Sequence, residues 1–524
     1  MAVKAVKKDK EISLESILWN CRNAVRGTIG GNEKNRDCVM GLVFLKFAGD
    51  KFKKRRAEIK AEHGDVPAFL EKPSFYRSKS VYYLPENCTW DFLVKSAGDD
   101  DIAVKIDTAM RDIADKNEPL QGALPQGFYA TSGLSQRQVK DLIDEINKID
   151  EQRFADKDLI GRVYEYFLQL FAIDSGTGNE KGEFYTPASI VQLIAELIEP
   201  YDGVVYDPCC GSGGMFVQSI KFIERHNGNR SNISVVGQEK NPDTWRLAKM
   251  NLAIRGISHN LGDTAVSTFE NDRHPDTKVN YIMANPPFNL KKWRGVDDLT
   301  DDYRWKGYGL PPVSNANYAW ILHMVSKLDE TNGIAGFLLA NGALNADGDE
   351  FRIRKELIEK DKVEAIIVLP REMFYSTDIS VTLWIVNNNK KARTLNGRNL
   401  RNRTHEVLFV DLRRWNTNIY EKSYVCFDDE QTAAIQKIFH DWQTGEGYKD
   451  VPELCKSATL EDIKKQNYSL APSKYIEFVD RDLQIDYEAE MARIQAEVKD
   501  ILQAEKKSQA MLEAAFKGIG YGVD

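Results

Sequence analysis

Short apolar runs alternate with helical stretches from Ser189 onward, and this alternation constrains the fold more than any other feature of the chain. Residues 204–206 form a β-branched and aromatic run, a turn rich in glycine follows, and an apolar helical stretch covers residues 215–223. Further strand-like runs lie at residues 333–340, 363–369 and 381–386. Because strands that alternate with helices are typical of one doubly wound sheet, we expect an α/β fold.

The turn over residues 207–214 reads Asp-Pro-Cys-Cys-Gly-Ser-Gly-Gly and predicts a ligand cradle. Its glycines let a ligand approach the backbone closely, and the helix that follows directs N–H groups outward. The dinucleotide fingerprint needs a glycine where Phe216 stands, and a P-loop needs a Gly-Lys-Ser/Thr ending, so NAD and ATP are disfavoured. The acidic start of the turn suits a ligand with an ammonium group. The candidate contacts are Asp207, Gly211, Ser212, Gly213 and Gly214.

Two acidic residues follow the next strand-like segments. Glu239 ends the run over residues 233–239 and could accept hydrogen bonds from two ribose hydroxyls. Asp263 lies in a turn between Gly262 and Thr264, where it could meet the amino group of an adenine. Taken singly, each residue is also consistent with an ordinary polar strand end. In series with the glycine turn they indicate S-adenosylmethionine as the cofactor.

The segment Asn285-Pro286-Pro287-Phe288 directly follows the apolar run over residues 281–284. The side-chain oxygen of Asn285 and the carbonyl of Pro286 could each accept one N–H of a planar amino group, which would localise the lone pair of its nitrogen. Two prolines remove competing donors, and Phe288 offers a flat face for a base. An ordinary Asn-Pro turn that closes a strand is the alternative interpretation.

A further element precedes the first strand. Glu183, Phe184 and Tyr185 lead into Thr186 and Pro187, which open an apolar helical stretch. Thr186 as N-cap and Pro187 at the first helical position predict a helix start. Capping explains these two residues without any ligand, but it does not explain the aromatic residues before them.

In this order, the four motifs resemble those of amino-methylating DNA methyltransferases, and more closely the methylation subunit of type I restriction-modification systems. The resemblance implies a Rossmann-like methyltransferase core that transfers a methyl group from S-adenosylmethionine to N6 of a flipped adenine in double-stranded DNA. Residues 285–288 would form the catalytic loop, and residues 183–187, 212–214 and Glu239 would contact the cofactor. The implied partners are a DNA-specificity subunit, a second copy of the methylation subunit and a restriction/translocase subunit.

Two other classes of function remain open at this point. RNA guanine and protein glutamine methyltransferases also use an Asn-Pro-Pro-aromatic loop, because a planar amide presents the same chemical problem. A non-catalytic assembly subunit that binds DNA or cofactor is the second alternative. The aromatic element over residues 184–187 and the large helical N-terminal region favour the DNA-modifying class.

The chain divides by pattern into three parts. Residues 1–155 read as a helical N-terminal domain, with helices near residues 14–26, 36–52 and 135–149, the last capped by Ser135. Residues 156–475 form the catalytic domain. Residues 476–524 form a C-terminal tail with one long helix from Tyr487, which we expect to contact the specificity subunit. Apolar residues keep coiled-coil-like spacing there, at Met491, Ile494, Val498, Ile501 and Leu512.

The 524 residues carry a net charge of −8, which is unusual for a protein that grips DNA unaided. Residues 51–56 and 390–403 are basic stretches that could touch phosphate, although each is also consistent with a solvated face. Residues 289–316 form a long loop that could close over a flipped base, with an aromatic side chain stacked on it. Surface disorder is the alternative for this loop. Its aromatic candidates are Trp293, Trp305 and Tyr308.

Cysteine usage and hydropathy indicate the compartment. Seven cysteines without regular spacing argue against a disulfide framework or a zinc site, so we expect no bound metal. The first ten residues are basic and lack an apolar core, and no long uncharged apolar run is present. We therefore expect no membrane span and a cytoplasmic location.

Overall fold

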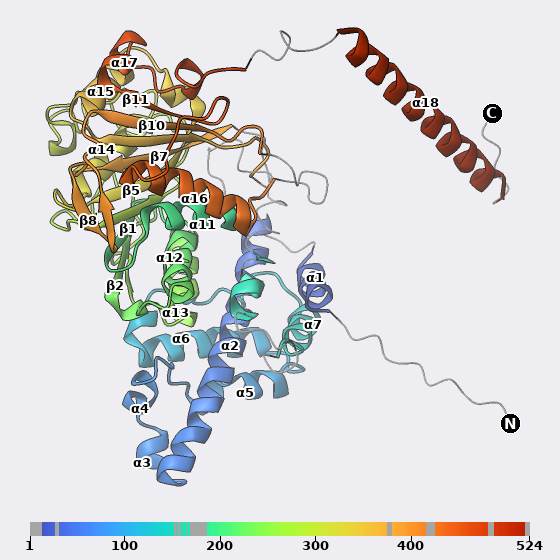
Figure 1. Cartoon of the computed structure of the whole chain (residues 1–524). Helices are drawn as coiled ribbons and strands as arrows, with labels where there is room; N and C mark the ends of the chain where they lie inside the picture. Colours follow the sequence, from blue (N-terminus) through green and yellow to red (C-terminus); the bar gives the residue numbers. More distant parts are fainter. Residues whose placement is uncertain are drawn as a thin grey trace.

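The computed structural model describes residues 13–26, 31–150, 154, 159–164, 166–167, 186–374, 380–415, 425–479 and 487–518 (Figure 1). Three predicted site residues, Glu183, Phe184 and Tyr185, lie outside the described residues.

The N-terminal part is helical. Helices are present at all three predicted places, although the second spans residues 31–63 and not only 36–52. The predicted N-cap Ser135 is confirmed, and it forms a capping box with Gln138. Buried residues of these helices gather into one apolar cluster. The helices are α1 (Leu14–Ala24), α2 (Gly31–His63), α3 (Pro67–Leu70), α4 (Pro73–Arg77), α5 (Trp90–Lys95), α6 (Ile102–Lys116) and α7 (Gln136–Ile146).

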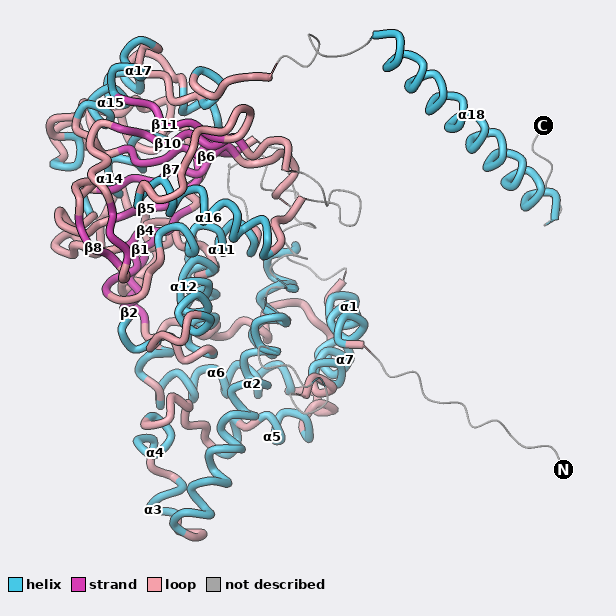
Figure 2. Tube along the Cα trace, viewed as in Figure 1, coloured by secondary structure: helices cyan, strands magenta, loops and turns pink. Residues whose placement is uncertain are grey.

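The second part is built on a sheet in which the described residues form nine strands, in the order β11-β10-β6-β7-β5-β4-β1-β2-β3 (Figure 2). Most neighbours are parallel, whereas β7 runs antiparallel between β5 and β6. The strands are β1 (Gly203–Asp207), β2 (Ile233–Gly237), β3 (His259–Asn260), β4 (Tyr281–Ala284), β5 (Ile334–Ala340), β6 (Val363–Val368), β7 (Val381–Asn387), β10 (Glu406–Asp411) and β11 (Cys455–Thr459). A separate hairpin pairs β8 (Arg393–Leu395) with β9 (Arg398–Leu400).

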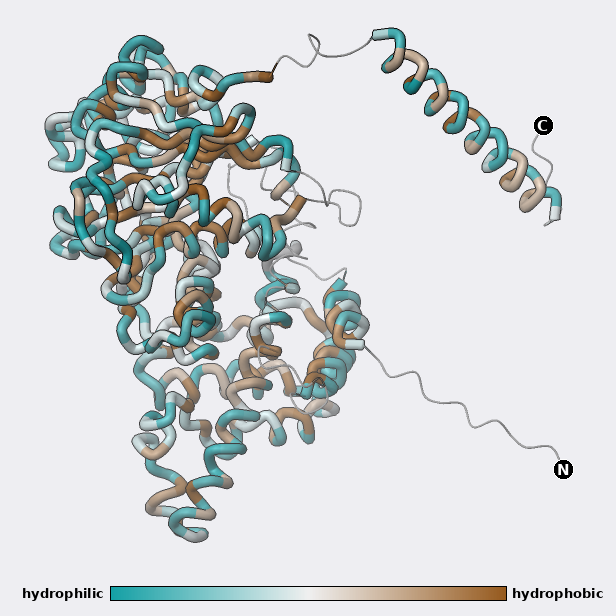
Figure 3. The backbone as a smooth tube through the Cα atoms, in the orientation of Figure 1, coloured by the Kyte–Doolittle hydropathy of each residue, from teal (hydrophilic) through white to brown (hydrophobic). Residues whose placement is uncertain are grey.

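Helices cover both faces of this sheet, so the predicted α/β fold class is confirmed. Every residue of β4, β5, β6 and β7 is buried, as expected for strands covered on both sides, and Figure 3 shows hydrophobic segments along the strands. One apolar cluster unites a face of the sheet with α11 (Ala188–Ile198), α12 (Gly214–Arg225), α13 (Pro242–Ile254) and α16 (Asp429–Thr444). The opposite cluster includes α14 (Asn317–Lys327), α15 (Asp349–Glu359) and α17 (Leu460–Lys465).

The order of the strands reverses at β1, which lies between β2 and β4. Parallel registers place Asp207 at the end of β1 beside Gly237 of β2, and Tyr206 beside Ile282 of β4. In open α/β sheets, ligands bind outside the carboxyl ends of the strands at such a reversal. The turns after β1, β2 and β4 therefore meet at the edge where a ligand is expected.

The N-terminal helices pack against α13, and α13 in turn packs against the sheet. Residues Leu247, Met250 and Ile254 of this helix belong to the N-terminal apolar cluster. The ammonium of Lys51 donates to the carbonyl of Ile254 at 2.6 Å, and the hydroxyl of Tyr82 donates to that of Ala253 at 3.3 Å. The helical part thus packs against the helix that follows β2.

The long C-terminal helix is confirmed as α18 (Tyr487–Gly518). None of its described residues is buried, and it stands apart from the body of the molecule (Figure 1). Among the described residues, every helix is too short or too polar to cross a bilayer.

Candidate active site

The glycine-rich turn after β1 is shaped by its own backbone and by β2. Gly211 and Gly213 adopt positive φ angles of 53° and 82°, which favour glycine. The N–H of Cys210 donates to the carbonyl of Gln238 at 2.9 Å and ties the turn to the end of β2. A Cβ atom added at Gly211 or at Gly214 would have no neighbouring heavy atom within 4 Å. The turn therefore presents open space in front of its backbone, as a cradle for a ligand requires.

Asp207 is buried at the start of this turn, with 2% of its surface exposed. The N–H of Cys209 donates to its carboxylate at 3.0 Å. Burial raises the pKa of Asp207 to about 7, and the neighbouring charge of Glu239 acts in the same direction. A cationic group at this position would favour the ionised carboxylate.

Glu239 reaches the glycine turn, as its position after β2 predicts. One carboxylate oxygen accepts from the N–H of Gly211 at 3.0 Å, and the other accepts from the N–H of Asn241 at 2.8 Å. Asp263 is exposed in the loop after β3. The same loop contacts the Glu239 segment through the N–H of Val266, which donates to the Glu239 carbonyl at 3.0 Å.

Asn285 directly follows β4, and its amide nitrogen donates to the hydroxyl oxygen of Thr186 at 2.9 Å. The predicted capping role of Thr186 is wrong, because α11 begins at Ala188 with Pro187 as its N-cap residue and without a side-chain capping bond. The hydroxyl contacts the catalytic-motif asparagine instead of the helix N-terminus. This bond joins two motifs that lie 99 residues apart in the chain.

Phe288 is 4% exposed and packs edge to face against Phe374, with 6.2 Å between the ring centroids. Phe374 follows β6 and was not predicted from the sequence. A single phenylalanine after a strand-like run carries no signal of its own, so only the folded structure reveals the contact between Phe288 and Phe374.

The loop over residues 289–316 is ordered, and two of its aromatic candidates are wrong. Trp293 and Trp305 are 6% and 4% exposed in the apolar cluster around α14. Their indole N–H groups donate to the carbonyls of Pro312 at 2.9 Å and Leu299 at 2.7 Å. These rings are core residues and cannot stack on a base without leaving the core. Tyr308 is half-buried, and the ammonium of Lys360 lies 4.1 Å from its ring centroid.

Most cations of the two basic stretches are engaged within the chain. In the second stretch, Lys390 pairs with Asp361 at 2.5 Å and Arg403 with Glu364 at 2.8 Å, and both cations are buried. In the first stretch, Arg55 is buried and pairs with Glu58 at 3.0 Å. These side chains stabilise the fold and are not exposed to a phosphate backbone.

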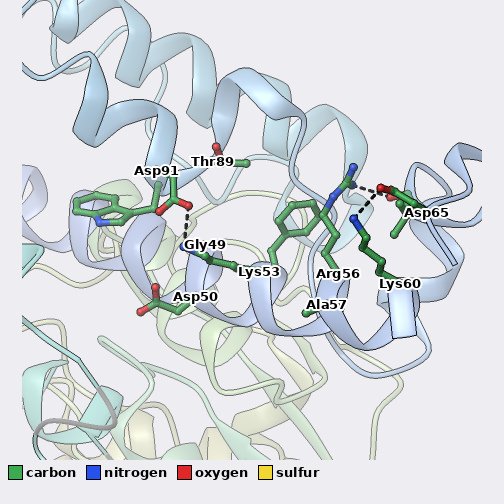
Figure 4. A pocket seen from close by; sticks show the side chains of 12 residues that line it. Gly49, Asp50, Lys53, Arg56, Ala57, Lys60, Asp65, Thr89 and Asp91 are labelled. Carbon is green, nitrogen blue, oxygen red and sulfur yellow. Dashed lines mark hydrogen bonds and ion pairs between the residues drawn. The ribbon is translucent and has the colours of Figure 1, made fainter. Parts of the chain in front are cut away.

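A cavity of about 290 Å³ lies in the N-terminal part, along α2 (Figure 4). Lys53 pairs with Asp91 at 2.8 Å and Lys60 with Asp65 at 2.6 Å, so the cations around the cavity face acids of the same chain. This cavity is separate from the carboxyl edge of the sheet, where the motif residues gather. Within the described part of the chain, no group of His, Cys, Asp and Glu side chains could hold a metal ion.

The glycine-rich turn follows β1 and the Asn-Pro-Pro-Phe turn follows the neighbouring strand β4, so both lie at one reversal of a doubly wound sheet. Residues 155–482, more than half of the chain, match the family model described as N-6 DNA Methylase. Residues 14–149 match the model described as HsdM N-terminal domain. The chain belongs to the methylation subunits of type I restriction-modification systems.

Curated relatives agree with this assignment. The HindI methylase subunit of a type I restriction enzyme from Haemophilus influenzae is 39% identical over 80% of this chain and 93% of the relative. The MjaIX methylase subunit from Methanocaldococcus jannaschii is 32% identical over 97% of this chain and 91% of the relative. The chain is therefore a DNA adenine methyltransferase that modifies N6 with S-adenosylmethionine, and the RNA, protein and non-catalytic alternatives are not favoured.

A solved structure shows the same fold. The methyltransferase subunit of a type I restriction-modification system from Streptococcus thermophilus has a TM-score of 0.71. It is 23% identical, and the match covers 88% of this chain and 98% of that chain.

Proposed function

We propose that Asn285 and Pro286 hold the amino group of the target adenine. The amide oxygen of Asn285 and the carbonyl of Pro286 each accept one N–H, which directs the nitrogen lone pair toward the methyl donor. S-adenosylmethionine supplies an electrophilic methyl group when it is bound. The observation that supports this role is the hydrogen bond from the amide nitrogen of Asn285 to the hydroxyl oxygen of Thr186. This bond fixes the orientation of the amide, so its oxygen points away from Thr186.

The aromatic pair Phe288 and Phe374 would form the walls of the base site. A flipped base is commonly held between aromatic or apolar side chains. Because the two rings already meet edge to face in the free protein, the base would enter by parting them. Pro287 keeps the turn rigid between Pro286 and Phe288, since its ring fixes φ.

The cofactor residues proposed are those of the turns after β1, β2 and β3. Glycines 211, 213 and 214 would let the cofactor lie against the backbone, and Ser212 would line the same turn. Asp207 would face its ammonium group, Glu239 its ribose hydroxyls and Asp263 its adenine. The open space in front of Gly211 and Gly214 supports this assignment. Glu183, Phe184, Tyr185 and Pro187 are proposed to complete the site.

We further propose that the chain works on double-stranded DNA in a complex with a specificity subunit. A second copy of the chain and a restriction/translocase subunit would complete the assembly. The exposed helix α18 supports the contact with the specificity subunit, because its apolar side chains have no cover in the body. Its exposed apolar residues include Met491, Ile494, Val498, Ile501 and Leu512.

The test is methylation of DNA by the Asn285→Ala variant in the complex. We expect N6-methyladenine formation to fall by about 10³-fold or more, because an acceptor for the reacting amino group is lost, while cofactor affinity stays within about twofold. Digestion to nucleosides measures the product, and calorimetry measures cofactor binding. Asn389→Ala is the matched control. Asn389 follows β7 at the opposite edge of the sheet, and its amide nitrogen donates to the carbonyl of Thr331 at 2.9 Å. Full activity of Asn285→Ala would refute the catalytic assignment.

A further inference from the structure

Helix α14 is almost wholly buried, yet it carries polar side chains inside the core. Asn317 at its start is 1% exposed, and His323 in its last turns is 0% exposed. Buried polar groups are costly unless they are paired, so the partners of these side chains are informative. Both partners belong to segments that flank the two turns of the site.

Asn317 forms hydrogen bonds with Asn289, the residue that follows the catalytic tetrapeptide. Its side-chain oxygen accepts from the N–H of Asn289 at 2.9 Å, and its amide nitrogen donates to the side-chain oxygen of Asn289 at 2.9 Å. The amide nitrogen of Asn315 also donates to that oxygen, at 3.3 Å. Two reciprocal hydrogen bonds between the same pair of residues fix both the position and the direction of the chain after Phe288.

These hydrogen bonds stabilise a left-handed backbone conformation at Asn289, where φ is 54°. Only glycine adopts this conformation without cost, although asparagine tolerates it better than most residues. The next residue also contacts the start of α14, since the N–H of Ala316 donates to the carbonyl of Leu290 at 2.9 Å. The chain therefore reverses immediately after Phe288 and returns to α14.

The other end of α14 holds the strand that precedes the cofactor turn. The imidazole of His323 lies 3.0 Å from the hydroxyl of Tyr206, the residue before Asp207. Burial lowers the pKa of His323 to about 3, and the neighbouring guanidinium of Arg304 acts in the same direction, so the ring is neutral. One rigid helix thus contacts the backbone segments on which both halves of the site are built.

We propose that Asn317 is a positioning residue for methyl transfer: it sets the catalytic turn, through Asn289, at a fixed place relative to the cofactor strand that the same helix holds. The proposal rests on the proposed function, in which Asn285 and Pro286 hold the amino group. Asn317 is buried and bonded to Asn289, so it would act on the reaction through that residue. Its effect on rate comes from holding the acceptors within a few tenths of an ångström of their productive place, where small displacements are costly.

The experiment compares three variants in the complex with the specificity subunit, under single-turnover conditions with a duplex that carries one target site. Asn317→Ala is expected to lower the rate of methyl transfer by about 10- to 100-fold, with the cofactor Kd and the DNA Kd within about twofold of the parent's. Tyr318→Phe is the matched control. Its neighbouring hydroxyl is equally buried on α14 but donates to the carbonyl of Ala343 at 2.6 Å, so its loss should change the rate by less than about threefold.

A second pair of variants tests the left-handed turn itself. Asn289→Gly keeps the N–H that Asn317 accepts and tolerates positive φ, whereas Asn289→Ala keeps the N–H but resists that conformation. We expect the glycine variant to methylate faster than the alanine variant. An unchanged rate for Asn317→Ala, a rate loss in Tyr318→Phe as large as that in Asn317→Ala, or equal rates for the two Asn289 variants would overturn the proposal. Asn285→Ala is assayed beside them, and its full activity would instead refute the proposed function.

Discussion

Asp207, which we propose faces the ammonium group of the cofactor, is a buried carboxylate with a raised pKa. Its pKa of about 7 lies above the ordinary value of 3.8, because burial disfavours the charged carboxylate. The folded free protein therefore favours the protonated form more than the unfolded chain does. The contribution of Asp207 to stability is present below pH 4 and is lost as the pH rises through about 7.

We predict that cofactor affinity rises with pH, because the ionised carboxylate is the form that attracts an ammonium group. If only that form binds, the affinity should increase about tenfold between pH 6 and pH 8. Titration calorimetry in buffers of different ionisation enthalpy measures both the affinity and the protons released. Asp207→Asn should bind more weakly and lose this pH dependence, and an unchanged pH profile in that variant would contradict the assignment.

At the scale of elements, two cations of the basic stretch over residues 390–403, Lys390 and Arg403, are buried. Arg403 and Glu364 are both fully buried, and Asn387 donates to the same carboxylate at 2.5 Å. The charge of Arg403 contributes to holding the pKa of Glu364 below its usual value, despite the opposing effect of burial. This pair joins the β9–β10 connection to β6, so it positions the outer strands of the sheet.

We predict that Arg403→Met destabilises the protein by about 3–5 kcal/mol, because the carboxylate of Glu364 is left buried without its cation. The double variant Glu364→Gln with Arg403→Met should regain part of this loss, since no uncompensated charge remains. Denaturant unfolding measures both. Lys437→Ala removes an exposed pair with Asp441 and should cost less than about 1 kcal/mol. If Arg403→Met and Lys437→Ala lowered the free energy of unfolding by the same amount, the buried Arg403–Glu364 pair would contribute little to stability.

At the scale of the whole molecule, α18 is the one long helix whose described residues include no buried side chain. A 32-residue helix in water without packing depends on a partner for most of its stability. The exposed apolar side chains recur at coiled-coil-like spacing, which suits a helical partner. Under the proposed function, the body would serve catalysis and this helix would serve assembly.

We predict that a chain ending at Val479 keeps the thermal midpoint of the body within about 2 °C, because none of the removed residues that the structure describes is buried. The same truncation should abolish co-purification with the specificity subunit. Differential scanning calorimetry and affinity capture measure the two effects. A doubled substitution on the apolar stripe, Ile494→Lys with Val498→Lys, should lose capture without truncation. Retained capture in both variants would place the contact elsewhere.

Much of the fold and of the candidate site could be predicted because the signals are local. The alternation of apolar runs predicts the doubly wound sheet, and positive-φ glycines at 211 and 213 mark the turn after β1. Ser135 predicts the N-cap of α7, and the spacing after Tyr487 predicts α18. Each of these features depends on residues within a few positions of one another, so the sequence carries them without the rest of the molecule.

The tertiary structure decided what depends on distant partners. Thr186 could cap a helix or contact Asn285, and only the approach of β4 to the start of α11 selects the second. Trp293 and Trp305 could face a base or a core, and the apolar surface of α14 makes burial favourable. The cations of residues 390–403 could meet phosphate, yet Glu364 on β6 captures one of them. The sequence by itself thus determined the elements and the chemistry of their turns, whereas the packing of the sheet determined which side chains remain available to a ligand.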